Sequence, residues 1–139
     1  MLTSRLFRSR RGSAAGAGAA AALLTSVALV AAAPAQAAPR ACPGADSSDP
    51  ARCAQVIGIN AGSALVMRTA PRYSAAPVAR YGNGQWLEVE CWTTGDPDAD
   101  GHGYRYWMRV STGSAWGYVN DWYLDTGGPG TWKSILHQC

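Results

Sequence analysis

Hydrophobic and polar residues alternate along the second half of the chain with the period of two that is typical of β-strands. The clearest example is QWLEVECW at residues 85–92. One face of this strand, expected to be buried, carries Leu87, Val89 and Cys91, and the other carries Trp86, Glu88, Glu90 and Trp92. Similar segments predict strands at residues 64–68, 78–80, 104–110 and 115–119. Turn signals separate these segments and none sustains a long helical stripe, so the sequence predicts an all-β domain.

The first 37 residues have the composition of a secretory signal peptide. Four arginines precede an apolar run through Val30, and AQA at residues 35–37 fits the small-residue cleavage rule. A retained N-terminal membrane anchor is the alternative, but the run is alanine-rich and ends at Pro34. We therefore expect cleavage, no membrane contact afterwards, and an extracellular or cell-wall location.

Removal of residues 1–37 changes the charge of the protein. It takes away four of the 12 basic residues and none of the 9 acidic ones, which leaves a net charge of −1. A chain so close to neutrality has no basic face on composition alone, so nucleic acid is not an expected partner. The remaining length allows one small domain, which we expect to be a monomer.

The four cysteines, Cys42, Cys53, Cys91 and Cys139, are expected to form two disulfides in an exported chain. Three pairings are possible. A Cys42–Cys53 bond would close a short Gly/Asp/Ser segment, and a Cys91–Cys139 bond would hold the C-terminal tail on a strand. Loop entropy gives these closures roughly 3 and roughly 4 kcal/mol. A zinc ion bound by all four cysteines is not expected, because no two of them have the short C-x2-4-C spacing that such sites use.

Several short motifs occur in the order found in bacterial SH3 (SH3b) domains. They are Leu65, Met67, Arg68 and Pro71, then Val78 and Gly84, then Trp107 and Val110, and finally GYVNDWYL at residues 117–124. The chain resembles this family over residues 62–126. The resemblance implies a small SH3-like barrel, preceded here by an N-terminal extension at residues 38–61 and followed by a short C-terminal tail at residues 127–139. It also implies recognition of cell-wall peptidoglycan, often of its peptide cross-bridges.

Two features depart from the family pattern. Ala70 stands where a glycine often precedes the proline, and the connection from Cys91 to Trp107 is longer than usual. This connection contains GDPDADGHG, in which Asp96, Asp98 and Asp100 alternate as in the front half of an EF-hand calcium loop. The bidentate glutamate of such a loop is replaced by Trp107, so we expect a polar loop and no metal site. A weaker calcium site completed by carbonyls or water is the alternative.

The sequence offers little for catalysis. The two histidines, His102 and His137, lie in no recognisable catalytic context, and the cysteines are better explained as disulfides than as nucleophiles. Glu88 and Glu90 share one strand face, whereas glycosidase carboxylates flank a substrate from opposed walls. We therefore expect a protein that is not an enzyme and uses no cofactor.

Aromatic residues are abundant in the exported part of the chain, which holds six tryptophans and six tyrosines. We expect Trp107, Tyr118 and Trp86 in the core. The others exceed what one small core can bury, and exposed Trp and Tyr suit peptide or sugar ligands. The candidate binding residues are Tyr73, Trp92, Tyr104, Tyr106, Trp116, Trp122 and Tyr123, with Asp121 and Arg105 as polar anchors.

These observations predict a secreted, non-catalytic binding module that recognises peptidoglycan or a peptide through an exposed aromatic face. One alternative is a secreted inhibitor or interaction protein that binds an exported protein through the same face. A second alternative is a calcium-dependent binder that uses the aspartate loop.

Overall fold

The structure is a computed structural model that describes residues 37–46, 48 and 50–139. Residues 1–36 of the predicted signal peptide lie outside the described residues. The described residues fall within one compact unit, Ala33–Cys139. In this part of the chain no helix has the length and apolar character needed to cross a bilayer.

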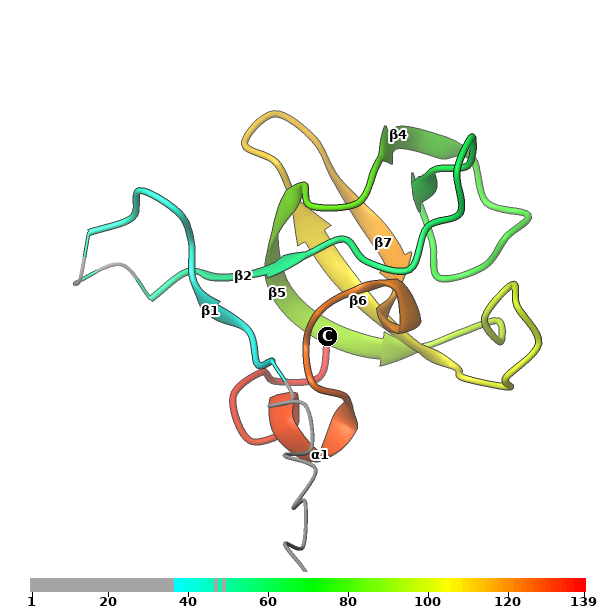
Figure 1. Cartoon of the computed structure of the whole chain (residues 1–139). Helices are drawn as coiled ribbons and strands as arrows, with labels where there is room; N and C mark the ends of the chain where they lie inside the picture. The colour runs from blue at the N-terminus through cyan, green and yellow to red at the C-terminus, as the bar shows by residue number, and fades with distance from the viewer. Residues whose placement is uncertain (1–36, 47, 49) are drawn as a thin grey trace, which may run out of the picture. The chain divides into compact units, whose positions relative to one another are not determined.

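Seven antiparallel strands of the described residues form one sheet in the order β1-β2-β5-β6-β7-β3-β4 (Figure 1). They are β1 (Arg40–Ala41), β2 (Arg52–Gln55), β3 (Leu65–Arg68), β4 (Pro77–Tyr81), β5 (Trp86–Thr94), β6 (Tyr106–Ser111) and β7 (Trp116–Asn120). The predicted all-β class is confirmed, and the five predicted strands correspond to β3 to β7. The sheet is not closed, because β1 and β4 are its edges.

The segment expected to be an N-terminal extension contributes two strands to the sheet. β2 pairs with the central strand β5, with Ala54 opposite Leu87. Val56 continues this segment with a bridge to Leu124. Ala54 and Val56 are both fully enclosed in the core, so residues 52–56 are part of the folded unit.

The alternation predicted for β5 holds only as far as Val89, because the register with β6 shifts between Val89 and Cys91. Val89 lies opposite Val110 on the core side, whereas Trp92 lies opposite Met108. Directly opposed residues share a sheet face, and Met108 belongs to the core. The bulge therefore turns Trp92 to the core side, and the expectation that Trp92 shares a face with Trp86 is wrong.

The main core lies on one side of the sheet. It is built from the inward residues of β2, β3, β5, β6 and β7 together with residues that follow β7. Its members include Met67, Leu87, Val89, Met108, Val110, Val119, Leu124, Trp132 and Leu136. Trp107 is buried outside this cluster, and Tyr118 and Trp86 are only half-buried, because all three occupy the other face of the sheet.

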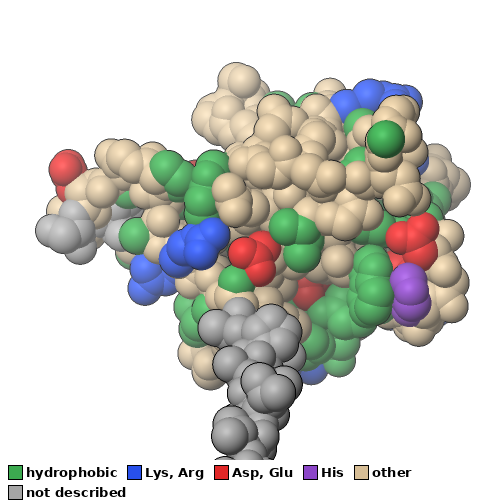
Figure 2. All heavy atoms as spheres, in the orientation of Figure 1, with side chains coloured by type: hydrophobic (Ala, Val, Ile, Leu, Met, Phe, Trp, Pro, Cys, Tyr) green, Lys and Arg blue, Asp and Glu red, His purple; other side chains and the backbone are tan. Residues whose placement is uncertain are grey.

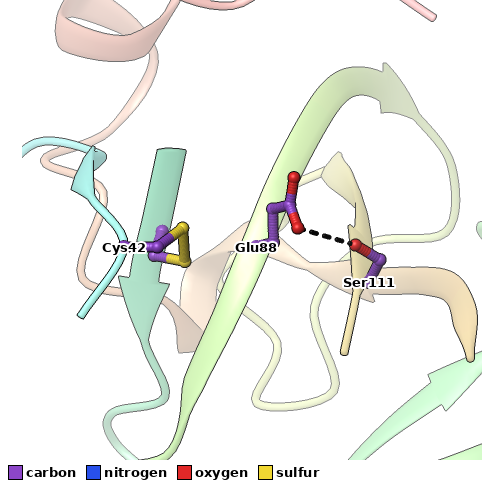
Figure 3. The surroundings of a disulfide bond; sticks show 4 residues. Cys42, Glu88 and Ser111 are labelled. Carbon is purple, nitrogen blue, oxygen red and sulfur yellow. Dashed lines mark hydrogen bonds between the residues drawn. A yellow bond between two sulfur atoms is a disulfide. The ribbon is translucent and has the colours of Figure 1, made fainter. Parts of the chain in front are cut away.

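Two disulfides connect the ends of the described chain to the sheet. Cys42 is bonded to Cys53 on β2, beside β5, where Ser111 donates a hydrogen bond to Glu88 (Figure 3). Cys91 on β5 is bonded to Cys139. The pairing that the sequence left open is thereby established, and two disulfides are typical of an oxidising, extracellular environment.

Two short helical turns follow β7. The 3-10 helix η1 (Asp121–Tyr123) begins at Asn120, whose side chain accepts a hydrogen bond from the Trp122 amide. The single turn α1 (Pro129–Trp132) begins with Pro129, which needs no amide partner at that position. The chain then returns to β5, where the amide of Cys139 donates to the carbonyl of Trp92 at 2.9 Å. The tail is therefore packed against the C-terminal half of β5, next to Trp92.

Candidate functional site

A continuous row of aromatic side chains lies where the core side of the sheet reaches solvent. Each ring contacts the next, with centroid separations of 4.1 to 6.0 Å. We call this row the aromatic ridge, and its members in order are His102, Trp122, Tyr104, Tyr106 and Trp92. Trp122 is 41% exposed, so the ridge presents apolar ring surface to a ligand.

Strand geometry explains how the ridge is assembled. Tyr106 precedes Met108 by two positions on β6, so its side chain points to the same side of the sheet. The bulge in β5 places Trp92 on this side as well, and the two rings meet edge to face with centroids 6.0 Å apart. Trp132 lies behind both rings, 5.3 Å from each centroid, and is fully buried.

A buried carboxylate, that of Asp121, supports the middle of the ridge. Asp121 is 2% exposed, and its carboxylate accepts three hydrogen bonds. The donors are Tyr104 Oη at 2.5 Å, Thr126 Oγ1 at 2.7 Å and Trp132 Nε1 at 2.9 Å. Burial raises the pKa of Asp121, although these donors oppose the shift. Burial and the neighbouring carboxylate likewise raise the pKa of Tyr104, so its hydroxyl stays protonated and continues to donate.

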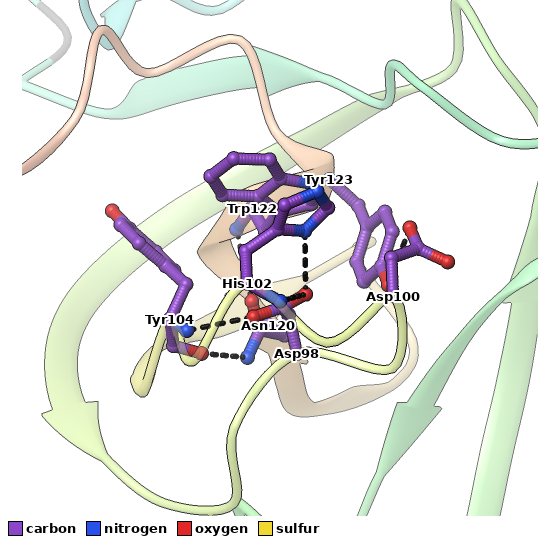
Figure 4. Close-up of polar contacts among 7 residues, drawn as sticks. All are labelled: Asp98, Asp100, His102, Tyr104, Asn120, Trp122 and Tyr123. Carbon is purple, nitrogen blue, oxygen red and sulfur yellow. Dashed lines mark hydrogen bonds and ion pairs between the residues drawn. The ribbon is translucent and has the colours of Figure 1, made fainter.

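The loop between β5 and β6 is organised around a second buried carboxylate, Asp98 (Figure 4). Asp98 accepts hydrogen bonds from the backbone amides of His102 at 3.0 Å and Tyr104 at 2.6 Å, and its Oδ2 lies 2.8 Å from His102 Nδ1. Burial alone would raise the pKa of Asp98, but these donors outweigh it and lower the pKa to about 2. Asp98 therefore stays ionised and fixes the loop against Tyr104.

This loop places His102 at one end of the ridge. The imidazole ring lies flat on the indole of Trp122, with an interplanar angle of 21°. On the face shown in Figure 2, a band of hydrophobic side chains lies beside a histidine side chain. Since the imidazole is held by Asp98 on one side and by Trp122 on the other, the loop between β5 and β6 is a fixed part of the surface.

The three alternating aspartates serve different protein partners. Asp96 accepts a hydrogen bond from the Tyr73 amide at 2.8 Å, and Asp100 accepts one from Tyr123 Oη at 3.1 Å, whereas Asp98 is turned toward His102 and Tyr104. Within the described residues no group of three or more His, Cys, Asp or Glu side chains is placed to hold a metal ion. The loop carboxylates therefore act as acceptors for the fold in this structure.

Tyr73 and Tyr123, two of the candidate binding residues, line a separate pocket of about 290 Å³ together with Arg68, Asp100, Trp107 and Asn120. The Tyr73 ring meets Trp107 edge-on, with centroids 5.2 Å apart. One buried polar atom of its lining residues, Arg68 Nε, has no hydrogen-bond partner in the described part of the chain. Burial raises the pKa of both tyrosines, that of Tyr123 to about 12, so both remain neutral.

The structure therefore divides the candidate binding residues into groups. The ridge unites Trp92, Tyr104, Tyr106 and Trp122. Trp116 lies apart on β7, 54% exposed, next to Tyr118 and beneath the guanidinium of Arg109. Asp121 supports Tyr104 from inside, so it reaches the surface only through that side chain. Arg105 is exposed beside Tyr104.

Three residues at the ridge were missed by sequence reasoning: His102, Trp132 and Lys133. A signal existed for His102, because a histidine four residues after an aspartate within a glycine-rich loop can close the loop by pairing with it. Trp132 and Lys133 carry no local signal, since they reach the ridge only through the path of the tail between Leu124 and Cys139.

The two strand carboxylates and the four cysteines considered for catalysis are engaged in structural contacts. Glu90 pairs with Arg109 at 3.0 Å and Glu88 accepts from Ser111. Among the described residues every cysteine is in a disulfide. The arrangement as it stands offers stacking surface and hydrogen-bonding tips, which are the features of a binding surface.

Comparisons of the chain with models of protein families, with curated proteins and with solved structures find no match.

Proposed function

We propose that this protein is a secreted, non-catalytic binding module that recognises cell-wall peptidoglycan through its aromatic ridge. The observation that carries the proposal is the unbroken contact of five rings from His102 to Trp92. A row of flat apolar rings with polar tips matches a polymer of sugars and short peptides, because such a ligand offers apolar faces and hydrogen-bonding groups in turn.

The rigidity of the ridge supports this proposal. Asp121 holds Tyr104 and Trp132, Asp98 holds the loop that carries His102, and the Cys91–Cys139 bond holds the tail. Protein side chains that are already held in place lose less conformational entropy when a ligand binds. The affinity is higher as a result.

The motif order shared with SH3b domains supports the same function. We propose that the sheet is a variant of the SH3-like barrel, in which β3 to β7 carry the shared motifs. In this reading the ridge combines Trp92, Tyr106 and Trp122 of the barrel segments with His102 and Tyr104 of the long β5–β6 connection, which is an addition to the barrel.

Co-sedimentation with isolated peptidoglycan sacculi tests the proposal. We expect the wild-type protein to pellet with sacculi and Trp122→Ala to lose most of this binding. Trp116→Ala is the matched control, because it removes an indole that is at least as exposed but lies off the ridge. Pelleting that Trp116→Ala loses and Trp122→Ala keeps would contradict the assignment of the ridge.

A protein partner is the competing function for the same surface. If the wild-type protein stays in the supernatant, peptidoglycan is excluded as the ligand and an exported protein bound to the ridge takes its place. A secreted inhibitor of that kind predicts a complex of defined stoichiometry in size-exclusion chromatography, which Trp122→Ala would disrupt.

A further inference from the structure

We propose that Lys133, which lies beside the aromatic ridge, binds a carboxylate of the ligand and thereby selects ligands that carry one. This inference rests on the proposed function and deepens it, since it names the chemical group that the ligand must present at one end of the row of rings.

Lys133 is the only lysine of the chain, and its ammonium group is held on the ridge. Lys133 Nζ lies 4.5 Å from the ring centroid of Tyr106 and 5.1 Å from that of Trp92. It also donates a hydrogen bond to Tyr106 Oη at 2.9 Å. The negative faces of the rings attract the cation and keep it beside the surface on which a ligand would stack.

Within the described residues the charge of Lys133 has no counter-ion. The ion pairs of the described residues join Arg40 to Asp125 and Arg109 to Glu90, the Asp98 carboxylate contacts His102, and none of these contacts involves Lys133. An ammonium group has three hydrogens to donate, and Tyr106 Oη is the one acceptor that it meets in the described part of the chain. An exposed cation with free donors favours an anion at this position.

The backbone around Lys133 is fixed. The preceding residue, Trp132, is fully buried, and its indole donates to Asp121. The Lys133 amide donates to the Pro129 carbonyl at 3.4 Å, and the tail returns to β5 through the Cys91–Cys139 bond. The Lys133 backbone is therefore anchored, and its side chain lies on the same side of the sheet as Trp92 and Tyr106.

A carboxylate fits better than a phosphate monoester, which carries about two negative charges at neutral pH. Lys133 supplies one positive charge, and the only basic ring of the ridge as described, that of His102, already contacts the Asp98 carboxylate at 2.8 Å. The buried Asp121 carboxylate behind Tyr104 and Trp132 repels a doubly charged group more strongly than a singly charged one. Recognition by one cation and a row of rings thus matches a singly charged acid attached to a sugar or a peptide.

The test uses sacculi from which phosphate-bearing polymers have been stripped, so that carboxylates are the acidic groups present. One portion is left unmodified, and in the other the carboxyl groups are converted to neutral methylamides. We expect the purified, oxidised protein to bind the amidated sacculi about fivefold more weakly, as is reasonable for one partly exposed ion pair.

Variants of the protein connect this preference to Lys133. Lys133→Gln is expected to bind both preparations equally, at the level of the wild-type protein on amidated sacculi, and Lys133→Arg to keep the preference. Arg80→Gln is the matched control, because it removes one exposed positive charge from β4, which is not part of the ridge. Trp122→Ala should weaken binding to both preparations.

The outcomes separate the two proposals. Equal wild-type binding to both preparations, or a preference that survives in Lys133→Gln, would overturn the role of Lys133 and leave peptidoglycan binding intact. Sacculi that retain their phosphate polymers form a third preparation, and binding to these alone would show that the group recognised is a phosphate and would also overturn the role of Lys133. Absence of binding to every preparation would overturn the proposed function, and this inference with it.

Discussion

The imidazole of His102 lies flat on the indole of Trp122, with ring centroids 4.1 Å apart. The same imidazole also contacts the carboxylate of Asp98, with 2.8 Å between His102 Nδ1 and Asp98 Oδ2. A loop inserted between two strands is thereby joined to the 3-10 helix that follows β7. The contact makes the order of the loop and the position of an exposed tryptophan depend on each other.

Replacement of His102 tests this dependence. We expect His102→Ala to lower the free energy of unfolding by about 1 kcal/mol, since it removes a ring stack and a hydrogen-bonding contact with the Asp98 carboxylate. It should also broaden the NMR signals of the Trp122 indole, because the ring loses its neighbour. His137→Ala, the matched control at an exposed histidine of the tail, should change neither. Sharp Trp122 signals in His102→Ala would mean that the loop does not hold the indole.

The pH dependence of stability should reveal Asp98. Its pKa is lowered to about 2 in the folded protein from 3.8, so its contribution is complete above pH 3.8 and disappears as the pH falls through about 2. We expect Asp98→Asn to be less stable than the wild type by about 3 kcal/mol near neutrality, because buried amides lose a charged acceptor. The difference should shrink in urea unfolding curves recorded at successively lower pH. A difference that stays constant down to pH 2 would contradict the assigned role.

The two ridge tyrosines should respond differently to loss of the hydroxyl. Tyr104 Oη donates to the buried Asp121, so Tyr104→Phe leaves that carboxylate short of one donor and should cost about 1–2 kcal/mol of stability. Tyr106 Oη accepts from the exposed Lys133, so Tyr106→Phe should cost less than about 0.5 kcal/mol. Both variants keep their rings, and chemical denaturation measures the difference. Equal costs would mean that Asp121 does not depend on Tyr104.

The disulfides should contribute unequally to stability. Cys91–Cys139 spans 48 positions and Cys42–Cys53 spans 11, so loop entropy predicts losses of about 4 and about 3 kcal/mol when each pair is replaced by alanine. Only Cys91→Ala/Cys139→Ala should also red-shift tryptophan fluorescence, because it frees the tail that buries Trp132. A red shift caused by Cys42→Ala/Cys53→Ala instead would contradict this packing.

Calcium should leave the protein unaffected. Asp96, Asp98 and Asp100 each accept hydrogen bonds from different parts of the fold, so a cation would have to displace those donors before it gained three ligands. We expect the Tm to be the same with millimolar Ca²⁺ as with EDTA. A rise in Tm that Asp98→Ala removes would revive the calcium-dependent binder.

The sequence by itself determined the class of the fold and the positions of five of its strands, β3 to β7. Period-two alternation at residues 64–68, 78–80, 85–92, 104–110 and 115–119 is a local property, because successive side chains of an extended chain point to opposite faces. Disulfides were likewise expected from the even number of cysteines together with the predicted export. The strand β2 was not predicted, because residues 52–56 are too few to show a clear alternation of apolar and polar residues.

The tertiary structure alone decided which aromatic residues form a surface. A bulge in β5 moves Trp92 from the face of Trp86 to the core side, and strand alternation cannot reveal a register shift that arises from pairing with β6. Asp121 is buried because the residues that follow it, including Thr126 and Trp132, cover its carboxylate. The Cys91–Cys139 bond holds this segment in place. Trp132 and Lys133 reach the ridge by the same path. The ridge depends on contacts between residues far apart in the chain, and these are created by packing and are absent from any local pattern.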